Sequence, residues 1–168
     1  MTSSLLFDFS VNKENKTIHV TREFDADKSL VWKAWTTAEL LDQWWAPKPY
    51  RAETKSLDFR EGGTWLYAMV SPENEKIWCK ADYTNINLTK QVSWLDAFCD
   101  EHGKENTEKP RSSWTNVFTE NNGITTVNIT LQHNSLADIE TMMEMGFKEG
   151  FTMGLQNLDE LLVSLKNK

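Results

Sequence analysis

Apolar and polar residues alternate along much of the chain, as they do in the strands of a sheet that has one buried face. The first such segment is Leu5–Val11, and the second is Thr17–Phe24, in which Ile18, Val20 and Arg22 share a face. The polar run between the two segments is typical of a turn. The pattern therefore predicts a β-hairpin near the N-terminus.

The stretch from Tyr50 to His133 alternates in the same way, with short interruptions. These interruptions contain Gly, Pro, Asn and Ser, which favour turns, so we predict an antiparallel meander. The polar and charged stretch Asp100–Pro110 is predicted to be a long exposed loop. The predicted strands are Ala52–Phe59, Gly63–Val70, Ile77–Ile86, Gln91–Cys99, Trp114–Thr119 and Thr125–Gln132.

Two short helices are predicted between the hairpin and the meander. The run Asp25–Ser29 ends the second strand and supplies an N-cap for the first helix, and Thr37 is placed to cap the second. Pro47 and Pro49 end the second helix, because proline cannot continue the backbone hydrogen bonds. The residues that define the helices are Val31, Trp32, Trp35 and Thr36 in the first, and Leu40, Leu41, Trp44 and Trp45 in the second.

The last part of the chain, Leu136–Leu165, is predicted to be one long amphipathic helix. Gly146, Gly150 and Gly154 lie four residues apart beside its apolar stripe. Each glycine lowers helix stability by about 1 kcal/mol relative to alanine, so the row indicates either close packing on the sheet or room for a cavity. The stripe consists of Ile139, Met143, Phe147, Phe151, Leu155, Leu158, Leu162 and Leu165.

Length and charge narrow the classes of protein to which the chain can belong. The 168 residues fit a single domain, residues 1–168, whose core needs neither disulfides nor metals. The net charge of -7, without a basic stripe, argues against binding to nucleic acid or to an anionic membrane surface. No apolar run is long enough to span a membrane and no secretory signal is present, so we predict a cytoplasmic protein.

Three segments resemble those of homologues of the heat-shock protein 90 ATPase activator, a family of START-like domains. The segment TREFDADKSLVWKAWTTAELLDQWWAP (Thr21–Pro47) resembles the family's opening strand, Asp-Ala turn, helix and Trp-Trp-x-Pro stop. The segment DFREGGTWLYAM (Asp58–Met69) resembles the family's Arg-x-Gly-Gly turn into an aromatic strand. The segment GFTMGLQNLDELL (Gly150–Leu162) is similar to its closing helix. In this order, the three motifs extend the resemblance to nearly the whole chain.

The resemblance implies an α+β helix-grip fold, in which a curved antiparallel sheet wraps around a long C-terminal helix. It also implies an apolar cavity between the sheet and that helix. Relatives with this fold bind hydrophobic small molecules or lipids, act on polyketides or, in the eukaryotic namesake, stimulate a chaperone ATPase. The namesake also depends on a separate N-terminal domain, for which this chain has no room, and this counts against the chaperone function.

Aromatic residues are the main candidates for ligand contact. The eight Trp and eight Phe exceed what an ordinary domain carries, and aromatic side chains line pockets as well as fill cores. Alternation places Trp65, Tyr67 and Met69 on one face of their strand; the residues on such faces either line a cavity or fill a core. The candidate pocket residues are Trp35, Trp44, Trp45, Trp65, Tyr67, Met69, Trp94, Phe98, Trp114, Phe118, Met143, Phe147 and Phe151.

Catalytic and metal-binding patterns are sparse. His19, His102 and His133 fall in unrelated segments, so we expect no metal and no cofactor. Asp82 and Asp96 lie in the middle of predicted strands, and an inward-facing one would be a buried acid suited to general acid–base chemistry. We favour a solvent-facing orientation for both.

The two cysteines, Cys79 and Cys99, have neither a metal-binding spacing nor a Cys-x-x-Cys motif. We interpret them as small buried side chains, and their spacing leaves a disulfide between them open.

We therefore expect a domain that binds a hydrophobic or amphipathic small molecule between the sheet and the C-terminal helix. One alternative is an enzyme of the polyketide cyclase or hydrolase type that uses an inward polar residue; another is a module that interacts with heat-shock protein 90 in a stress response. Two polar residues converging in the cavity, one with a shifted pKa, would favour the enzyme. A free strand edge near Leu5–Val11 allows edge pairing, so we expect a monomer or a weak dimer.

Overall fold

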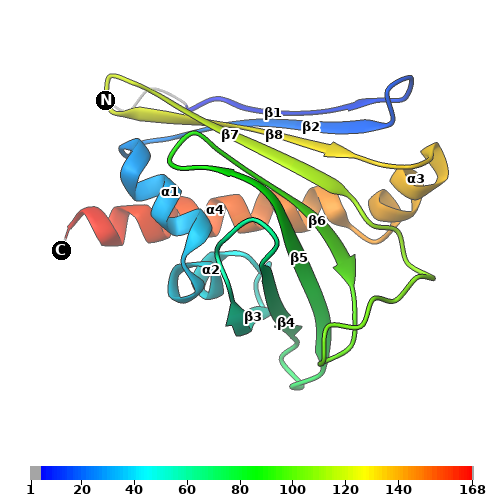
Figure 1. Ribbon diagram of the computed structural model, residues 1–168. Helices are drawn as coiled ribbons and strands as arrows, with labels where there is room; N and C mark the ends of the chain where they lie inside the picture. The colour runs from blue at the N-terminus through cyan, green and yellow to red at the C-terminus, as the bar shows by residue number, and fades with distance from the viewer. Residues whose placement is uncertain (1–4, 168) are drawn as a thin grey trace.

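The computed structural model describes residues 5–167 and contains one eight-stranded antiparallel sheet and four helices (Figure 1). A hairpin is followed by two short helices, six further strands and two closing helices, which is the predicted order. Most boundaries lie within two residues of the predicted ones. The strands are β1 (Phe7–Asn12), β2 (Thr17–Phe24), β3 (Arg51–Leu57), β4 (Thr64–Val70), β5 (Lys76–Asn87), β6 (Gln91–Phe98), β7 (Ser113–Asn121) and β8 (Ile124–Gln132). The helices are α1 (Lys28–Thr36), α2 (Ala38–Trp44), α3 (Leu136–Glu144) and α4 (Phe147–Lys166).

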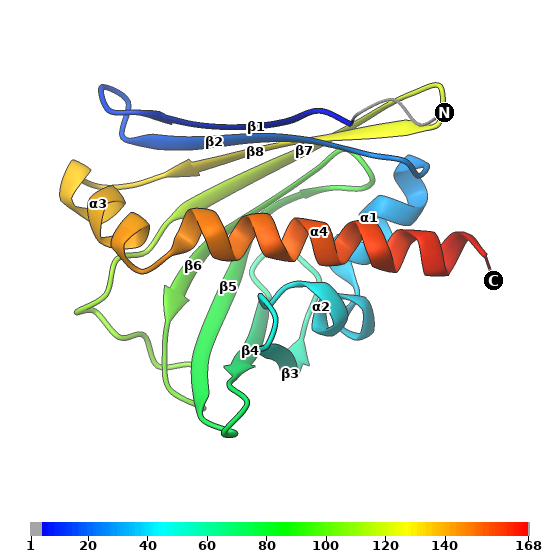
Figure 2. The same cartoon turned by 180° about the vertical axis from the view of Figure 1, so that it is seen from behind.

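The sheet has the strand order β1-β2-β8-β7-β6-β5-β4-β3 and curves around α4, as Figure 2 shows from the helix side. Residues of β2 alternate between buried and partly exposed, with Ile18, Val20 and Arg22 on the buried face as predicted. Arg22 is accommodated there because its guanidinium pairs with Asp159 of α4. This arrangement is the helix-grip fold, and it leaves β1 and β3 as the two edges of the sheet.

The prediction of one continuous C-terminal helix is wrong, because the segment breaks between α3 and α4. Gly146 lies at the break as the N-cap residue of α4, with a φ of 84°. This left-handed conformation costs glycine little, whereas it strains other residues by about 1–2 kcal/mol. The break lets α3 turn away from α4 and cover one end of the sheet (Figure 2).

The other two glycines of the row have different functions. A Cβ at Gly154 would lie 3.2 Å from the carbonyl oxygens of both Trp44 and Trp45, so this glycine allows α4 to pack closely on the end of α2. A Cβ at Gly150 would meet only Pro47, at an ordinary contact distance of 3.6 Å. Close packing thus explains Gly154, whereas Gly150 faces the space described below.

The two short helices begin and end where the pattern predicts. Asp27 caps α1, because its Oδ1 accepts a hydrogen bond of 2.8 Å from the backbone N–H of Leu30. Thr37 is the N-cap residue of α2, but its side chain makes no cap hydrogen bond, contrary to expectation. At the far end of α2, the buried Asn157 of α4 donates a 3.1 Å hydrogen bond to the carbonyl oxygen of Ala46. This contact satisfies a polar group just beyond the helix and ties α2 to α4.

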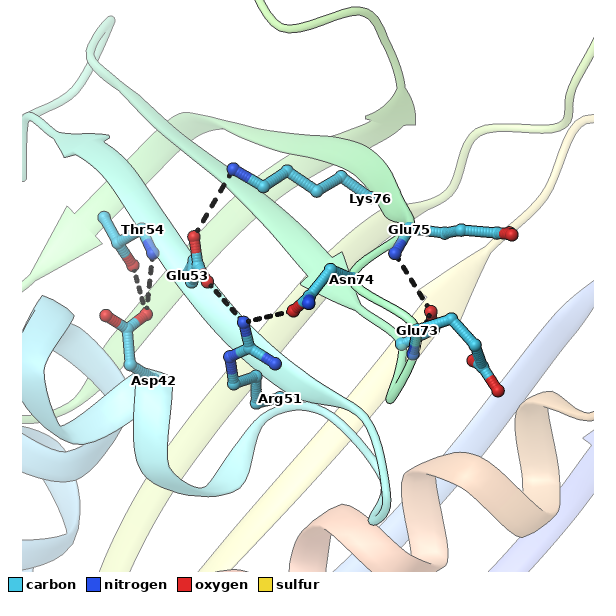
Figure 3. A network of polar contacts seen from close by, with 9 residues as sticks. Asp42, Arg51, Glu53, Thr54, Glu73, Asn74, Glu75 and Lys76 are labelled. Carbon is cyan, nitrogen blue, oxygen red and sulfur yellow. Dashed lines mark hydrogen bonds and ion pairs between the residues drawn. The ribbon is translucent and has the colours of Figure 1, made fainter.

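A polar network fixes the edge strand β3 to its neighbours (Figure 3). Asp42 of α2 accepts hydrogen bonds from the backbone N–H of Thr54, at 2.9 Å, and from its hydroxyl, at 2.6 Å. Burial raises the pKa of Asp42, while the hydrogen bonds from Thr54 act in the opposite direction. Glu53 of β3 pairs with Arg51 of the same strand at 3.1 Å and with Lys76 of β5 at 3.6 Å. These contacts hold α2 and β3 in place beside the concave face.

None of the helices in residues 5–167 is both long and apolar enough to cross a membrane.

Candidate functional site

A cavity of about 360 Å³ lies between the concave face of the sheet and the helices α3 and α4. Strands β4, β5, β6 and β7 supply its floor, and α4 forms its roof. The segment after α2 and the loop before β7 complete the wall. The lining residues are Trp45, Pro47, Tyr50, Trp65, Tyr67, Met69, Ile77, Cys79, Ala81, Trp94, Asp96, Ala97, Phe98, Pro110, Trp114, Met142, Met145, Gly146, Phe147, Gly150 and Phe151.

Small residues on the central strand β5 create the space. Cys79 pairs in register with Tyr67 on β4 and with Phe98 on β6. Ala81, two residues further on, lies in register between Trp65 and Asp96. Neighbouring side chains on one face of a sheet contact one another, so short side chains between long ones leave a depression in that face. The next residue on this face of β5 is the large Tyr83, which lies beside Trp94, so the depression ends there.

The walls of the cavity form a continuous aromatic cluster. The Trp45 ring lies near the middle, with its centroid 5.4 Å from that of Trp65 and 5.7 Å from that of Trp114. The Trp94 and Trp114 rings stack at 5.4 Å, and Phe151 meets the Trp114 ring edge-on at 5.4 Å. Offset-stacked and edge-on pairs are favourable aromatic arrangements, so these contacts stabilise the walls.

The structure places most of the predicted pocket residues around this cavity, but not all of them. Trp35, Trp44 and Phe118 lie instead in the filled core between α1, α2 and the sheet. Met143 packs against the core, and Met142 takes the place predicted for it, because the break at Gly146 changes the register of α3 relative to α4. The predicted residues that line the cavity are Trp45, Trp65, Tyr67, Met69, Trp94, Phe98, Trp114, Phe147 and Phe151.

Asp96 projects into the cavity, so the solvent-facing orientation favoured for it is wrong. Its Oδ1 accepts a 2.6 Å hydrogen bond from the backbone N–H of Ser112, and its Oδ2 accepts a 2.7 Å hydrogen bond from Trp114 Nε1. Burial raises the pKa of Asp96 to about 6, against the lowering effect of these hydrogen bonds and of Arg111. Asp82 behaves as expected, since it lies outside the cavity and pairs with Lys80 and Arg111.

The raised pKa of Asp96 predicts a specific dependence of stability on pH. The folded state binds the Asp96 proton more tightly than the unfolded state, so the stability present below about pH 4 is lost as the pH rises through about 6. We expect the wild type to lose about 2 kcal/mol of unfolding free energy relative to Asp96→Asn over this range. Urea denaturation of both proteins between pH 4 and pH 7.5 measures the difference.

Asp82→Asn is the matched control, because it removes a carboxylate outside the cavity. This variant should keep the decrease of unfolding free energy with pH that comes from Asp96. Identical pH dependence of the wild type and Asp96→Asn would contradict a raised pKa at this position.

Tyr67 and Cys79 also line the cavity, and both are neutral near pH 7. Tyr67 accepts a 3.0 Å hydrogen bond at its hydroxyl oxygen from Trp45 Nε1, and burial raises its pKa well above the ordinary value. Burial also raises the pKa of the Cys79 thiol to about 12. The thiol is therefore not poised as a nucleophile, since only the thiolate reacts.

A buried serine and histidine lie behind the wall that carries Asp96. Ser112 Oγ is 2.8 Å from His133 Nε2, and both residues are buried. Neither lines the cavity, so this pair cannot reach a bound molecule. Its contribution is to fix the backbone of Ser112, whose N–H donates to Asp96.

The mouth of the cavity consists of residues that the sequence pattern did not single out. Tyr50, Ile77 and Met145 are among the exposed large apolar residues of the chain, and all three line the opening together with Pro47 and Pro110. They come from a loop, the start of a strand and a helix end, which meet only in the folded chain. Their signal is the exposure of apolar side chains, which is known only once the fold is known.

Comparison with known proteins settles the family. The model of the family described as activator of Hsp90 ATPase homolog 1-like protein matches residues 25–163. The chain belongs to this family. No curated protein matches the chain.

Solved structures agree with this assignment. A crystal structure of a protein from Mycobacterium smegmatis is 28% identical, with a TM-score of 0.86 over 95% of this chain and 97% of that one. An Arthrobacter aurescens protein is 27% identical, with a TM-score of 0.88 over 94% of this chain and 91% of the other. A Staphylococcus epidermidis protein is 27% identical, with a TM-score of 0.81 over 92% and 94% of the two chains. The helix-grip fold predicted from the sequence is thus confirmed.

Proposed function

We propose that the protein binds one apolar or amphipathic small molecule in the cavity between the sheet and α4. The observation that carries this proposal is the aromatic cavity of about 360 Å³, which lies within the range of volumes found for ligand sites. The family commonly binds hydrophobic ligands, which agrees with this function.

The hydrogen bonding of the walls favours an apolar ligand, because several polar atoms of the walls already have hydrogen-bond partners within the protein. The indole N–H groups of Trp45, Trp65 and Trp114 donate to Tyr67, Thr54 and Asp96. The rings therefore offer their faces to the cavity, and a ligand gains mainly from the burial of apolar surface.

Direct binding tests the proposal. We expect 2-(naphthalen-2-yl)ethanol, a neutral bicyclic probe, to change the tryptophan fluorescence saturably, with one molecule bound per chain and a Kd on the order of 10 µM. Native mass spectrometry of the purified protein serves as the independent measurement, since it detects a retained organic molecule. Absence of saturable binding up to millimolar probe, together with a clean apo mass, would overturn the proposal.

A proton-handling enzyme is the second candidate, and Asp96 is the observation that favours it. A carboxyl with a pKa near 6 is suited to general acid–base chemistry, and Tyr67 and Cys79 share the same cavity. However, Asp96 accepts from Ser112 and Trp114 and Tyr67 accepts from Trp45, so the two groups do not hydrogen-bond to each other. Conversion of a bound molecule by the wild type, lost in Asp96→Asn, would establish this function in place of simple binding.

Interaction with heat-shock protein 90 stays a prediction. Its test is whether the purified domain, at saturating concentration, raises the ATPase rate of that chaperone.

A further inference from the structure

We propose that the cavity selects molecules that carry a protonated amine on an aromatic or apolar body, and that Asp96 receives the amine. This inference rests on the proposed binding function and names the chemical class of its ligand. Three features of the cavity support it: the sign of its charge, the hydrogen bonding of Asp96 and the surrounding aromatic faces.

The charge of the cavity lining has one sign. Among the lining residues that the structure describes, Asp96 is the one carboxylate, and there is no lysine, arginine or histidine. A ligand carboxylate would therefore lose its hydration without gaining a positive partner and would lie in the same cavity as a second negative charge. A fatty acid or another organic acid fits this lining poorly, whereas a cation finds its counter-charge.

The carboxylate of Asp96 is hydrogen-bonded but has capacity left. The Ser112 N–H and the Trp114 indole N–H occupy one acceptor position on each oxygen. An ionised carboxylate offers about four such positions, so further donors can be accepted. Both present donors are neutral, and they hold the side chain in one orientation without neutralising it.

Arg111, the cation near Asp96, forms its ion pairs with other acids. It pairs with Glu105 at 2.7 Å and approaches Asp82 at 3.6 Å, and neither of these acids lines the cavity. Toward Asp96 it donates only to the backbone carbonyl oxygen, from Nε at 3.3 Å. The side-chain carboxylate thus lacks a cation on the cavity side, and its raised pKa is consistent with this.

The aromatic walls favour the same ligand class. Trp114 reaches Asp96 through its indole nitrogen and stacks on Trp94, while Trp65 lies in the same cross-strand row as Asp96. The faces of indole rings attract cations, and aromatic cages around organic ammonium groups exploit this attraction. Asp96 and these rings therefore offer an ammonium group both a counter-charge and π faces.

Three matched probes test the inference: 2-(naphthalen-2-yl)ethylamine, the corresponding ethanol and 2-naphthylacetate. They share a ring system and differ in a positive, neutral or negative end. By calorimetry at pH 7.5, we expect the amine to bind about tenfold or more tightly than the alcohol, and the acid to bind most weakly. In Asp96→Asn, the preference for the amine over the alcohol should disappear, because the counter-charge is lost and the ammonium group would lose its hydration without a partner.

Titration of the wild type provides a second test that does not depend on a variant. Amine affinity should fall about tenfold between pH 7 and pH 5 as Asp96 becomes protonated, while alcohol affinity stays constant. Tyr67 and Cys79, which face Asp96 from β4 and β5, have raised pKa values and stay neutral over this range. From α3 and α4 the lining residues are Met142, Met145, Gly146, Phe147, Gly150 and Phe151, which do not titrate. Behind Asp96 lie Arg111, which pairs with Glu105, and His133, which contacts Ser112 and whose pKa is lowered by burial.

Each result separates this inference from the proposed binding function. Equal affinities for amine and alcohol would overturn the choice of ligand class and leave binding established. Tightest binding of the acid would overturn it as well, and would require a cation in the cavity. If none of the three probes binds, both proposals fall.

Discussion

Replacement of Gly63 by alanine is expected to lower the free energy of unfolding by about 3–5 kcal/mol, an exceptionally large effect for one added methyl group. A Cβ at this position would overlap the carbonyl oxygen of Asp58 and lie 3.0 Å from that of Arg60. These atoms cannot move aside easily, because the Gly63 N–H donates to Arg60 at 2.8 Å and the Gly63 carbonyl accepts from Tyr83 at 2.9 Å. Urea denaturation of wild type and variant measures the loss.

Gly62→Ala is the matched control, one residue away in the same turn. Gly62 has a φ of 85°, but nothing lies within 4 Å of a Cβ placed there. Its replacement should therefore cost only the strain of the left-handed conformation, about 1–2 kcal/mol. Similar losses for the two variants would show that the turn relaxes around a Cβ at Gly63, and the steric argument would fail.

This turn illustrates how far the sequence leads. The motif Arg60-Glu61-Gly62-Gly63 was interpreted as a turn, and the structure confirms that it joins β3 to β4. The two glycines are required for different reasons, one for its backbone angle and the other for the space that a side chain would need. Only the position of the Asp58 carbonyl oxygen distinguishes them, and that position results from the fold.

Strands such as β2 and β8 were predictable because they have one face toward the core and one that is partly exposed. In β8, for example, Val127, Ile129 and Leu131 are fully buried and alternate with partly exposed residues. The same alternation is a local property of the sequence and needs no knowledge of neighbouring strands. The family motifs added the topology, which alternation alone does not give.

The break between α3 and α4 was not predictable from helical periodicity. Gly146, Gly150 and Gly154 look alike in sequence, yet Gly150 and Gly154 lie within α4 and only Gly146 adopts a positive φ. The apolar stripe continues through the break, so Met143 was predicted to line the cavity. In the structure Met142 lines it instead, and Met143 packs against the core.

The cavity was only partly predictable, because aromatic residues fill cores and line pockets alike. Trp35 and Trp44 were predicted to contact a ligand and lie in the filled core, whereas Trp45 lines the cavity. What distinguishes the two regions is the pair of small residues Cys79 and Ala81 between long neighbours. Their effect depends on the register of three strands, which a single sequence does not specify.

The second large effect is expected from filling the space above Ala81. Ala81 is almost fully buried, lines the cavity and lies in register between Trp65 and Asp96. In Ala81→Phe, the new ring would occupy the volume that a bicyclic ligand needs. We expect the Kd for 2-(naphthalen-2-yl)ethanol to rise about 100-fold or more, measured by tryptophan fluorescence. The free energy of unfolding should change by less than about 1.5 kcal/mol, because the ring enters empty space rather than a packed core.

Thr119→Phe is the control, because it introduces the same side chain at an exposed position of β7. It should leave binding unchanged, and far-ultraviolet circular dichroism should report the same fold for both variants. Wild-type affinity in a folded Ala81→Phe protein would place the ligand outside this cavity. We expect Ala81→Phe to lose binding of all three probes and Asp96→Asn to lose only the preference for the amine. This difference would separate the contribution of the space from that of the charge. The small residues on β5 provide the space, and the carboxylate beside them selects what enters it.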